Sequence, residues 1–126
     1  LATGQKRAVT RGWQEDARQN PPFAAKIPAI SGLLNTGILC DGLRAIDIDV
    51  DEAELVAAIE AEAFSRFGAA PVRYRDNSPR RLLLYRAAEG EPGKRVISGA
   101  HGKVEVLGYG QQGHAYGQHP SGAPLR

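Results

Sequence analysis

Two aspartates at alternate positions of an apolar segment are the residues of this chain best suited to chemistry. Asp47 and Asp49 alternate with Ile46, Ile48 and Val50, and a period of two is typical of a β-strand with one buried face. The two carboxylates therefore project from the same face, roughly 6.6 Å apart along the strand at about 3.3 Å per residue. Carboxylates at that spacing can chelate one hard cation or bridge two, so we predict a Mg²⁺ or Mn²⁺ site. A solvated pair on an exposed strand is the alternative, but aspartate is depleted in strands and like charges on one face repel each other.

Charged residues are concentrated in two neighbouring blocks, one acidic and one basic. Residues 41–63 hold eight acids and one arginine, and residues 73–95 hold seven bases and three acids. An acidic block beside a basic block suits a site for a metal ion and a phosphate, although two solvated faces of one domain give the same pattern. Within the basic block, Arg81 and Arg86 end an apolar segment. They are better placed for binding than the arginines of the preceding loop, which are Arg73, Arg75 and Arg80.

Three further patterns could bind a cofactor or a phosphate. Gly108, Gly110 and Gly113 form a G-x-G-x-x-G pattern, but a dinucleotide fingerprint must open a helix, and the residues that follow are rich in glycine and proline. A hairpin turn is the better interpretation, so we expect no NAD. Cys40 and three irregularly spaced histidines match a four-ligand zinc site poorly, so we expect no zinc. The imidazole of His119, at a predicted strand end, is either placed to donate to phosphate or exposed on a turn.

The elements that position these residues can be predicted from the same periodicities. Residues 43–50 are predicted to form a strand, followed at once by a helix with Asp51 as N-cap, Glu54 as its capping-box partner and Gly68 at its end. Residues 71–79 are predicted to form a basic loop. Further short strands are predicted at 37–40, 81–86, 95–98, 103–107 and 114–118, and a short helix at 12–19. One strand and helix followed by several strands indicate the α+β class.

Length and composition exclude several classes of protein. The 126 residues suffice for one small domain, and 42% hydrophobic with 24% charged residues is typical of a globular chain. No apolar run approaches the roughly 18 residues that cross a bilayer, so we expect no membrane as a partner. The single cysteine, Cys40, excludes an internal disulfide and favours a reducing, cytoplasmic compartment. The chain begins at Leu1 and contains no methionine, so we expect it to be a fragment of a longer protein.

Two regions of the chain resemble motifs of a known family. Residues 42–50, Gly-Leu-Arg-Ala-Ile-Asp-Ile-Asp-Val, resemble the first motif of archaeo-eukaryotic-type primases, an apolar strand with two aspartates. The segments 104–108, 110–112 and 115–122 resemble the second-motif region of the bifunctional DNA primase/polymerase (prim-pol) domain of phages, plasmids and integrated elements. Residues 79–86 resemble the basic strand between those motifs, and the resemblance spans roughly Trp13 to Arg126.

The resemblance implies a fold and a set of ligands. It implies a modified RRM-like βαββ catalytic core at 41–126, preceded by a small N-terminal arm and α/β unit at 1–40. It implies a two-metal Mg²⁺ or Mn²⁺ site held by Asp47 and Asp49, with a third acid on a strand beyond residue 126, before which the chain is truncated. It also implies that the triphosphate of an incoming nucleotide is bound by His119, Gly117, Arg81 and Arg86. The DNA backbone is then contacted by the three loop arginines, Arg73, Arg75 and Arg80.

The function implied by the resemblance is template-dependent nucleotidyl transfer by a DNA primase/polymerase in the replication of a mobile element. Its partners are a DNA template and primer, nucleoside triphosphates and a helicase in the same parent chain, in the cytoplasm of a bacterial or phage-infected cell. Whether the fragment is an active enzyme by itself stays open, because the third acid is not within it. Two alternatives also stay open: a catalytically incomplete module that binds nucleotides or nucleic acid, and a metal-dependent phosphohydrolase that uses the same aspartates.

Overall fold

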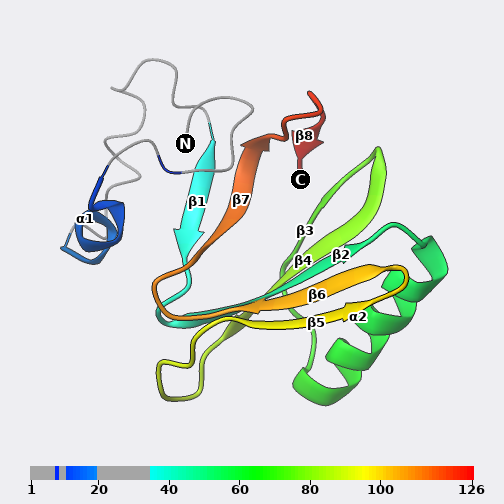
Figure 1. The fold of residues 1–126 in the computed structure, drawn as a ribbon, viewed down its shortest axis with the longest axis horizontal. Helices are drawn as coiled ribbons and strands as arrows, with labels where there is room; N and C mark the ends of the chain where they lie inside the picture. The colour runs from blue at the N-terminus through cyan, green and yellow to red at the C-terminus, as the bar shows by residue number, and fades with distance from the viewer. Residues whose placement is uncertain (1–7, 9–10, 20–34) are drawn as a thin grey trace.

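The described part of the chain forms two antiparallel β-sheets and two helices (Figure 1). The computed structural model describes residues 8, 11–19 and 35–126. The larger sheet has the order β3-β4-β2-β6-β5, formed by Val72–Arg75, Ser78–Arg86, Leu43–Val50, Gly102–Leu107 and Arg95–Gly99. The smaller sheet has the order β1-β7-β8, formed by Thr36–Leu39, Gln112–Gln118 and Pro124–Leu125. The helices are α1, Trp13–Gln19, and α2, Ala53–Phe67, so the α+β class is confirmed. Neither of these two described helices combines the length and the apolar character needed to cross a membrane.

Strand β2 lies at the centre of the larger sheet because its alternating side chains suit two different surroundings. Ile48 and Val50 are buried in a cluster with Val56 and Ala63 of α2, and Ile46 packs against the same cluster. The intervening aspartates therefore face the other side of the sheet, away from the helix. In Figure 1, α2 covers one face of this sheet, and the smaller sheet lies on the side away from α2. The predicted strand at 43–50 and its division into two faces are confirmed.

The start of α2 differs from its prediction, whereas its end does not. Glu52 occupies the N-cap position, and among the described residues its side chain makes no capping hydrogen bond. The predicted capping box of Asp51 and Glu54 is therefore wrong, because the Asp51 carboxylate is held by an arginine of β4 instead. Gly68 ends the helix as predicted, with φ of 83° and its N–H donating to the Phe64 carbonyl at 2.9 Å.

Residues 72–75 form the edge strand β3, whereas the sequence predicts a loop there. The prediction is wrong because an arginine-rich segment after a proline is typical of a loop, whereas here antiparallel pairing with β4 stabilises a strand. Strand β4 begins at Ser78 rather than at Arg81. The predicted burial of its leucines on both faces is confirmed: Leu83 packs in the α2 cluster, and Leu82 packs with Cys40, Ala45 and Leu107 on the opposite face.

The smaller sheet packs on this opposite face and joins the edge of the larger sheet. A Cβ at Gly113 of β7 would lie 3.2 Å from Leu82 Cδ2, so the two sheets are in close contact there. At the edge, Tyr74 of β3 and Arg126 exchange two backbone hydrogen bonds of 2.9 Å. The smaller sheet combines β1 with two strands from the C-terminal part of the chain. The predicted division of the chain into an N-terminal unit at 1–40 and a catalytic core at 41–126 stays a prediction.

The glycine-rich segment 108–113 forms a turn, closed by a hydrogen bond from Gln111 N–H to the Gly108 carbonyl at 3.1 Å. It connects β6 of the larger sheet to β7 of the smaller one, and these strands pair with different neighbours. The turn is therefore confirmed, but the expected hairpin is wrong. A strand, not a helix, follows it, as expected for a segment that is no dinucleotide fingerprint.

Candidate metal and nucleotide site

Three carboxylates converge on the face of the larger sheet that is turned away from α2, on the same side as the contact with the smaller sheet. Asp47 and Asp49 come from β2, and Glu105 comes from β6, directly opposite Asp47 in the strand register. One oxygen from each residue lies within 4.8 Å of the other two. The predicted convergence of the two aspartates is confirmed, whereas their role as metal ligands stays a prediction. Three carboxylates so close together repel one another unless cations compensate them, and carboxylate oxygens are the ligands that Mg²⁺ and Mn²⁺ prefer.

Glu105 is a member of the cluster that the sequence pattern does not predict. It is the most buried of the three residues, only 8% exposed. A signal was present, because Glu105 and Lys103 alternate with Val104 and Val106 in a predicted strand, as the aspartates do in β2. The spacing alone, however, does not reveal that β6 pairs with β2. The further acid that the resemblance implies beyond residue 126 stays a prediction.

Two lysines compensate the charge of Glu105. The ammonium groups of Lys94 and Lys103 lie 2.7 and 2.8 Å from its Oε1 atom. Hydrogen bonds from Lys103 and then Lys94 lower the pKa of the Glu105 carboxyl, against the opposing effect of burial. The same hydrogen bond raises the pKa of Lys103, with smaller contributions from the charges of Asp49 and Asp47. The ammonium of Lys103 therefore interacts with all three carboxylates.

Arg80 connects the cluster to Asp51. Its Nε and Nη2 atoms donate to the two carboxylate oxygens of Asp51 at 2.8 and 2.9 Å, and Nη1 donates to Asp49 Oδ1 at 3.0 Å. The hydrogen bonds from Arg80 lower the pKa of Asp51. A fork of this kind fixes the plane of the guanidinium, so Arg80 is held at the edge of the carboxylate cluster.

Arg73 is a second arginine at the cluster, and it is nearly buried. Its side chain is 11% exposed, and its Nη2 lies 3.7 Å from Asp47 Oδ1. Among the described residues, its Nε atom has no hydrogen-bond partner. Burial lowers the pKa of Arg73, whereas the charge of Asp47 raises it. A buried guanidinium with an unsatisfied donor is costly, and an anion bound at this edge would relieve part of that cost.

The structure places Arg81 and Arg86 away from the carboxylates. Arg81 lies opposite Ile48 in the register, and therefore on the α2 side of the sheet. Its Nε lies 3.8 Å from Glu60 of α2, and its guanidinium stacks over Tyr74 at 5.4 Å. Arg86 lies at the far end of β4, opposite Leu43. The structure thus brings Arg73 and Arg80 to the carboxylates. Arg75 lies on the same edge strand as Arg73 and adds positive charge near Asp51.

His119 lies in the turn between β7 and β8, beside the hairpin that carries these arginines. The Ser121 N–H donates to His119 Nδ1 at 3.1 Å, so in the neutral ring Nε2 carries the proton and can donate. The Ser121 hydroxyl also accepts a hydrogen bond of 3.4 Å from Asn77, at the tip of the β3–β4 hairpin. The turn with His119 and the hairpin with Arg73 and Arg80 are therefore neighbours, although they are about forty positions apart in the chain.

Gly117 is explained by packing against Asn35. Its φ of 115° is rare for residues with a side chain, and a Cβ would lie 2.1 Å from Asn35 Oδ1. The Asn35 amide is fully buried and exchanges two hydrogen bonds of 2.7 Å with the backbone of Gln118. Any contact of Gly117 with a nucleotide stays a prediction.

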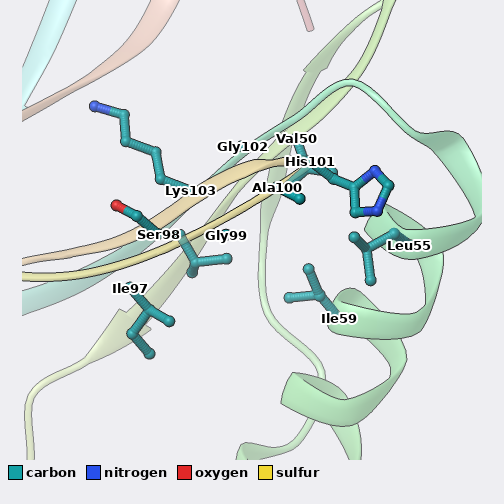
Figure 2. A pocket seen from close by; sticks show the side chains of 11 residues that line it. Val50, Leu55, Ile59, Ile97, Ser98, Gly99, Ala100, His101, Gly102 and Lys103 are labelled. Atoms are coloured by element: carbon teal, nitrogen blue, oxygen red, sulfur yellow. The ribbon is translucent and has the colours of Figure 1, made fainter.

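A separate cavity of about 170 Å³ lies on the opposite side of the sheet, between α2 and the β5–β6 hairpin. Figure 2 shows Leu55, Ile59 and Ile97 facing it, whereas the side chain of Lys103 runs away from it. Its lining is almost wholly apolar, and the three carboxylates project from the other face. The chemistry of the cluster therefore does not involve this cavity.

Of the comparisons with known proteins, the one with family models gives a match. No curated protein and no solved structure matches the chain at a significant level. A family model does match, and it covers residues 1–126, the whole sequence given. Its description is "Bifunctional DNA primase/polymerase, N-terminal". A match over the full length, together with carboxylates that could bind a metal beside a basic hairpin, supports one conclusion: the chain belongs to the family of N-terminal domains of bifunctional DNA primase/polymerases.

Proposed function

We propose that this chain carries out template-dependent nucleotidyl transfer, adding nucleoside triphosphates to a DNA primer. The observation that carries this proposal is the convergence of Asp47, Asp49 and Glu105 beside two arginines, in a chain that the family model matches throughout. Phosphoryl transfer depends mainly on positioning and on compensation of negative charge, and this face of the sheet offers groups for both.

The donor set suits a divalent cation. Asp47, Asp49 and Glu105 would hold Mg²⁺ or Mn²⁺ through hard carboxylate oxygens carried by two hydrogen-bonded strands. A divalent cation bound there would lower the pKa of a primer 3′-hydroxyl and neutralise charge on the leaving pyrophosphate. Because β2 is central in the sheet and paired on both sides, its two aspartates are rigidly positioned.

The residues proposed for the triphosphate are those that the fold brings to the edge of the cluster. Arg80 and Arg73 contact Asp49 and Asp47, so they can neutralise phosphate oxygens next to the cluster. His119, in the adjoining turn, can donate from Nε2. Gly117 supports this turn through its close contact with Asn35. Arg81 and Arg86 contribute less to this proposal, because one faces α2 and the other lies at the far end of β4.

The remaining assignments follow from the family resemblance and stay predictions. Arg75 and neighbouring bases are proposed to contact the backbone of the DNA template without reading its sequence, as phosphate contacts do. Replication of a mobile element, a cytoplasmic location and a helicase in the same parent chain are expectations of the same kind.

The test is extension of a DNA primer on a template in the presence of Mn²⁺. We expect wild-type protein to extend the primer. Asp49→Asn and Asp47→Asn should each lower the rate by about 100-fold or more, because each removes a carboxylate that would hold the divalent cation, and with the cation goes the compensation of charge at the reacting phosphate. Glu54→Gln is the matched control, since Glu54 is an exposed acid on α2, on the other side of the sheet. Unchanged synthesis in Asp49→Asn would refute the proposal.

The same experiment separates the two alternatives. Release of phosphate from nucleotides without any template would favour a metal-dependent phosphohydrolase. Binding of Mn²⁺ and nucleotide without synthesis would favour a binding module that does not catalyse transfer. A product whose length follows the template counts against both.

A further inference from the structure

Lys94 and Lys103 are basic residues to which the proposed function gives no role. Lys103 lies on β6, two residues before Glu105, and Lys94 immediately precedes β5, the neighbouring strand. Their Nζ atoms lie 2.7 and 2.8 Å from the same oxygen, Glu105 Oε1. Two positive charges are thus gathered on a single carboxylate oxygen, next to Asp47 and Asp49.

This arrangement depends mainly on the charge of Glu105, which both lysines contact, whereas the charges of Asp49 and Asp47 contribute less to holding Lys103. The Glu105 side chain is 11% exposed, whereas the side chains of Lys94 and Lys103 are 36% and 43% exposed. Exposed ammonium groups are well solvated and repel each other, so without an anion they would separate into solvent. Their long, flexible stems allow this movement without any change in the backbone.

We propose that Lys94 and Lys103 are further phosphate-binding residues, which Glu105 holds in this structure and releases when its carboxylate serves a divalent cation. The inference rests on the proposed function, because it assumes that Glu105 is a metal ligand. Once Glu105 is engaged in this way, both ammonium groups lie beside a dication without a carboxylate to compensate them. They then attract the most concentrated anion available, which is the triphosphate of the nucleotide or the leaving pyrophosphate.

The proposal gives the two lysines opposite effects on two ligands. The two lysines compete with the metal ion when no triphosphate is present, because a cation reaches Glu105 only by displacing them. When metal and triphosphate are both present, the lysines bind the triphosphate. Loss of one lysine should therefore strengthen the binding of metal and weaken the binding of metal-complexed triphosphate. A lysine with a merely structural role would not change the two affinities in opposite directions.

The test measures both affinities in Lys103→Met and Lys94→Met. Binding of Mn²⁺ alone is followed by the electron paramagnetic resonance signal of free Mn²⁺, and we expect each variant to bind about fivefold more tightly than wild type. Inorganic triphosphate, titrated as its Mn²⁺ complex in a calorimeter, should bind each variant about fivefold more weakly. Each single variant leaves the other lysine on Glu105, so the buried carboxylate keeps a partner and the fold is expected to persist.

Arg95→Met is the matched control. Arg95 directly follows Lys94 and is exposed, but it lies opposite Val106, which in turn lies opposite Ile46 of the α2 cluster. Its side chain is therefore on the other face of the sheet, and both affinities should stay at the wild-type value.

The outcomes distinguish this proposal from the proposed function. If wild type binds Mn²⁺, Asp49→Asn does not, and the lysine variants leave the Mn²⁺ affinity unchanged or lower it, the metal site stands and the role of the lysines is overturned. Unchanged affinity for the triphosphate complex in both variants overturns it equally. If wild type itself does not bind Mn²⁺, the metal site and the inference built on it both fall.

Discussion

Replacing Gly117 by alanine tests whether this glycine supports the fold or binds a ligand. At φ of 115° an alanine is strained, and its Cβ would lie 2.1 Å from Asn35 Oδ1 and 2.8 Å from Asn35 Cα. One of these atoms belongs to the backbone, so rotation of the Asn35 side chain cannot relieve the whole clash. Asn35 or β7 must move, and the two hydrogen bonds between the Asn35 amide and Gln118 are then lost.

The expected loss of stability follows from these contacts. An unfavourable backbone conformation costs about 1–3 kcal/mol. Two hydrogen bonds to a fully buried amide contribute about 1 kcal/mol each. Gly117→Ala should therefore lower the free energy of unfolding by about 3–5 kcal/mol, a large part of the roughly 5–15 kcal/mol typical of a domain.

Urea unfolding followed by circular dichroism measures this difference. Gly42→Ala is the control, because a Cβ at Gly42 meets no atom of the described residues within 4 Å and its φ lies outside the left-handed range. It should change stability little. If Gly117→Ala lost less than about 1 kcal/mol but bound triphosphate more weakly, the packing argument would be refuted and Gly117 would be assigned to the ligand.

Three further predictions concern the site and its supports. Asp51→Asn should leave the urea midpoint nearly unchanged, because Asp51 does not cap α2, and a large fall in helicity would contradict this. The same variant should weaken triphosphate binding, because the hydrogen bonds that hold the Arg80 guanidinium in place are lost. Gly102→Ala should weaken Mn²⁺ binding, because a Cβ there would lie 2.3 Å from the Asp49 carbonyl and displace its strand; wild-type affinity would contradict this. The lowered pKa of Glu105 contributes stability that is present above the ordinary value of about 4.5 and is lost as pH falls through the lower pKa of the folded state. In Glu105→Gln the free energy of unfolding should therefore fall less steeply as the pH is lowered through the acidic range. An unchanged pH dependence would contradict this role of Glu105.

Local patterns were sufficient to predict several elements. The alternation in 43–50 predicted both the strand and its two faces, because a strand directs successive side chains to opposite sides. Gly68 marked the end of α2 because a positive φ suits glycine. By contrast, β3 was missed, since a short basic strand at a sheet edge is stabilised by its pairing with β4 rather than by its own residues.

Which arginines face the carboxylates could not be predicted from the local sequence. Arg80 and Arg81 are adjacent in the chain and chemically identical, yet only the register of β4 against β2 decides that Arg80 faces Asp49 and Arg81 faces α2. A shift of one residue would exchange them, because the side-chain period of a strand is two. Asp51 was likewise assigned to the helix, since the sequence shows a capping pattern but not the arginine that reaches it from β4.

The aspartate pair is a local property of the chain, because residues two apart in one strand share a face whatever the rest of the fold does. The third carboxylate, the four cations that compensate the cluster and the place of His119 beside the basic hairpin are tertiary properties. They depend on the pairing of β6 with β2 and on the junction between the two sheets. Such contacts join residues tens of positions apart, and they are decided by the packing of the whole core, which no single segment of the sequence encodes.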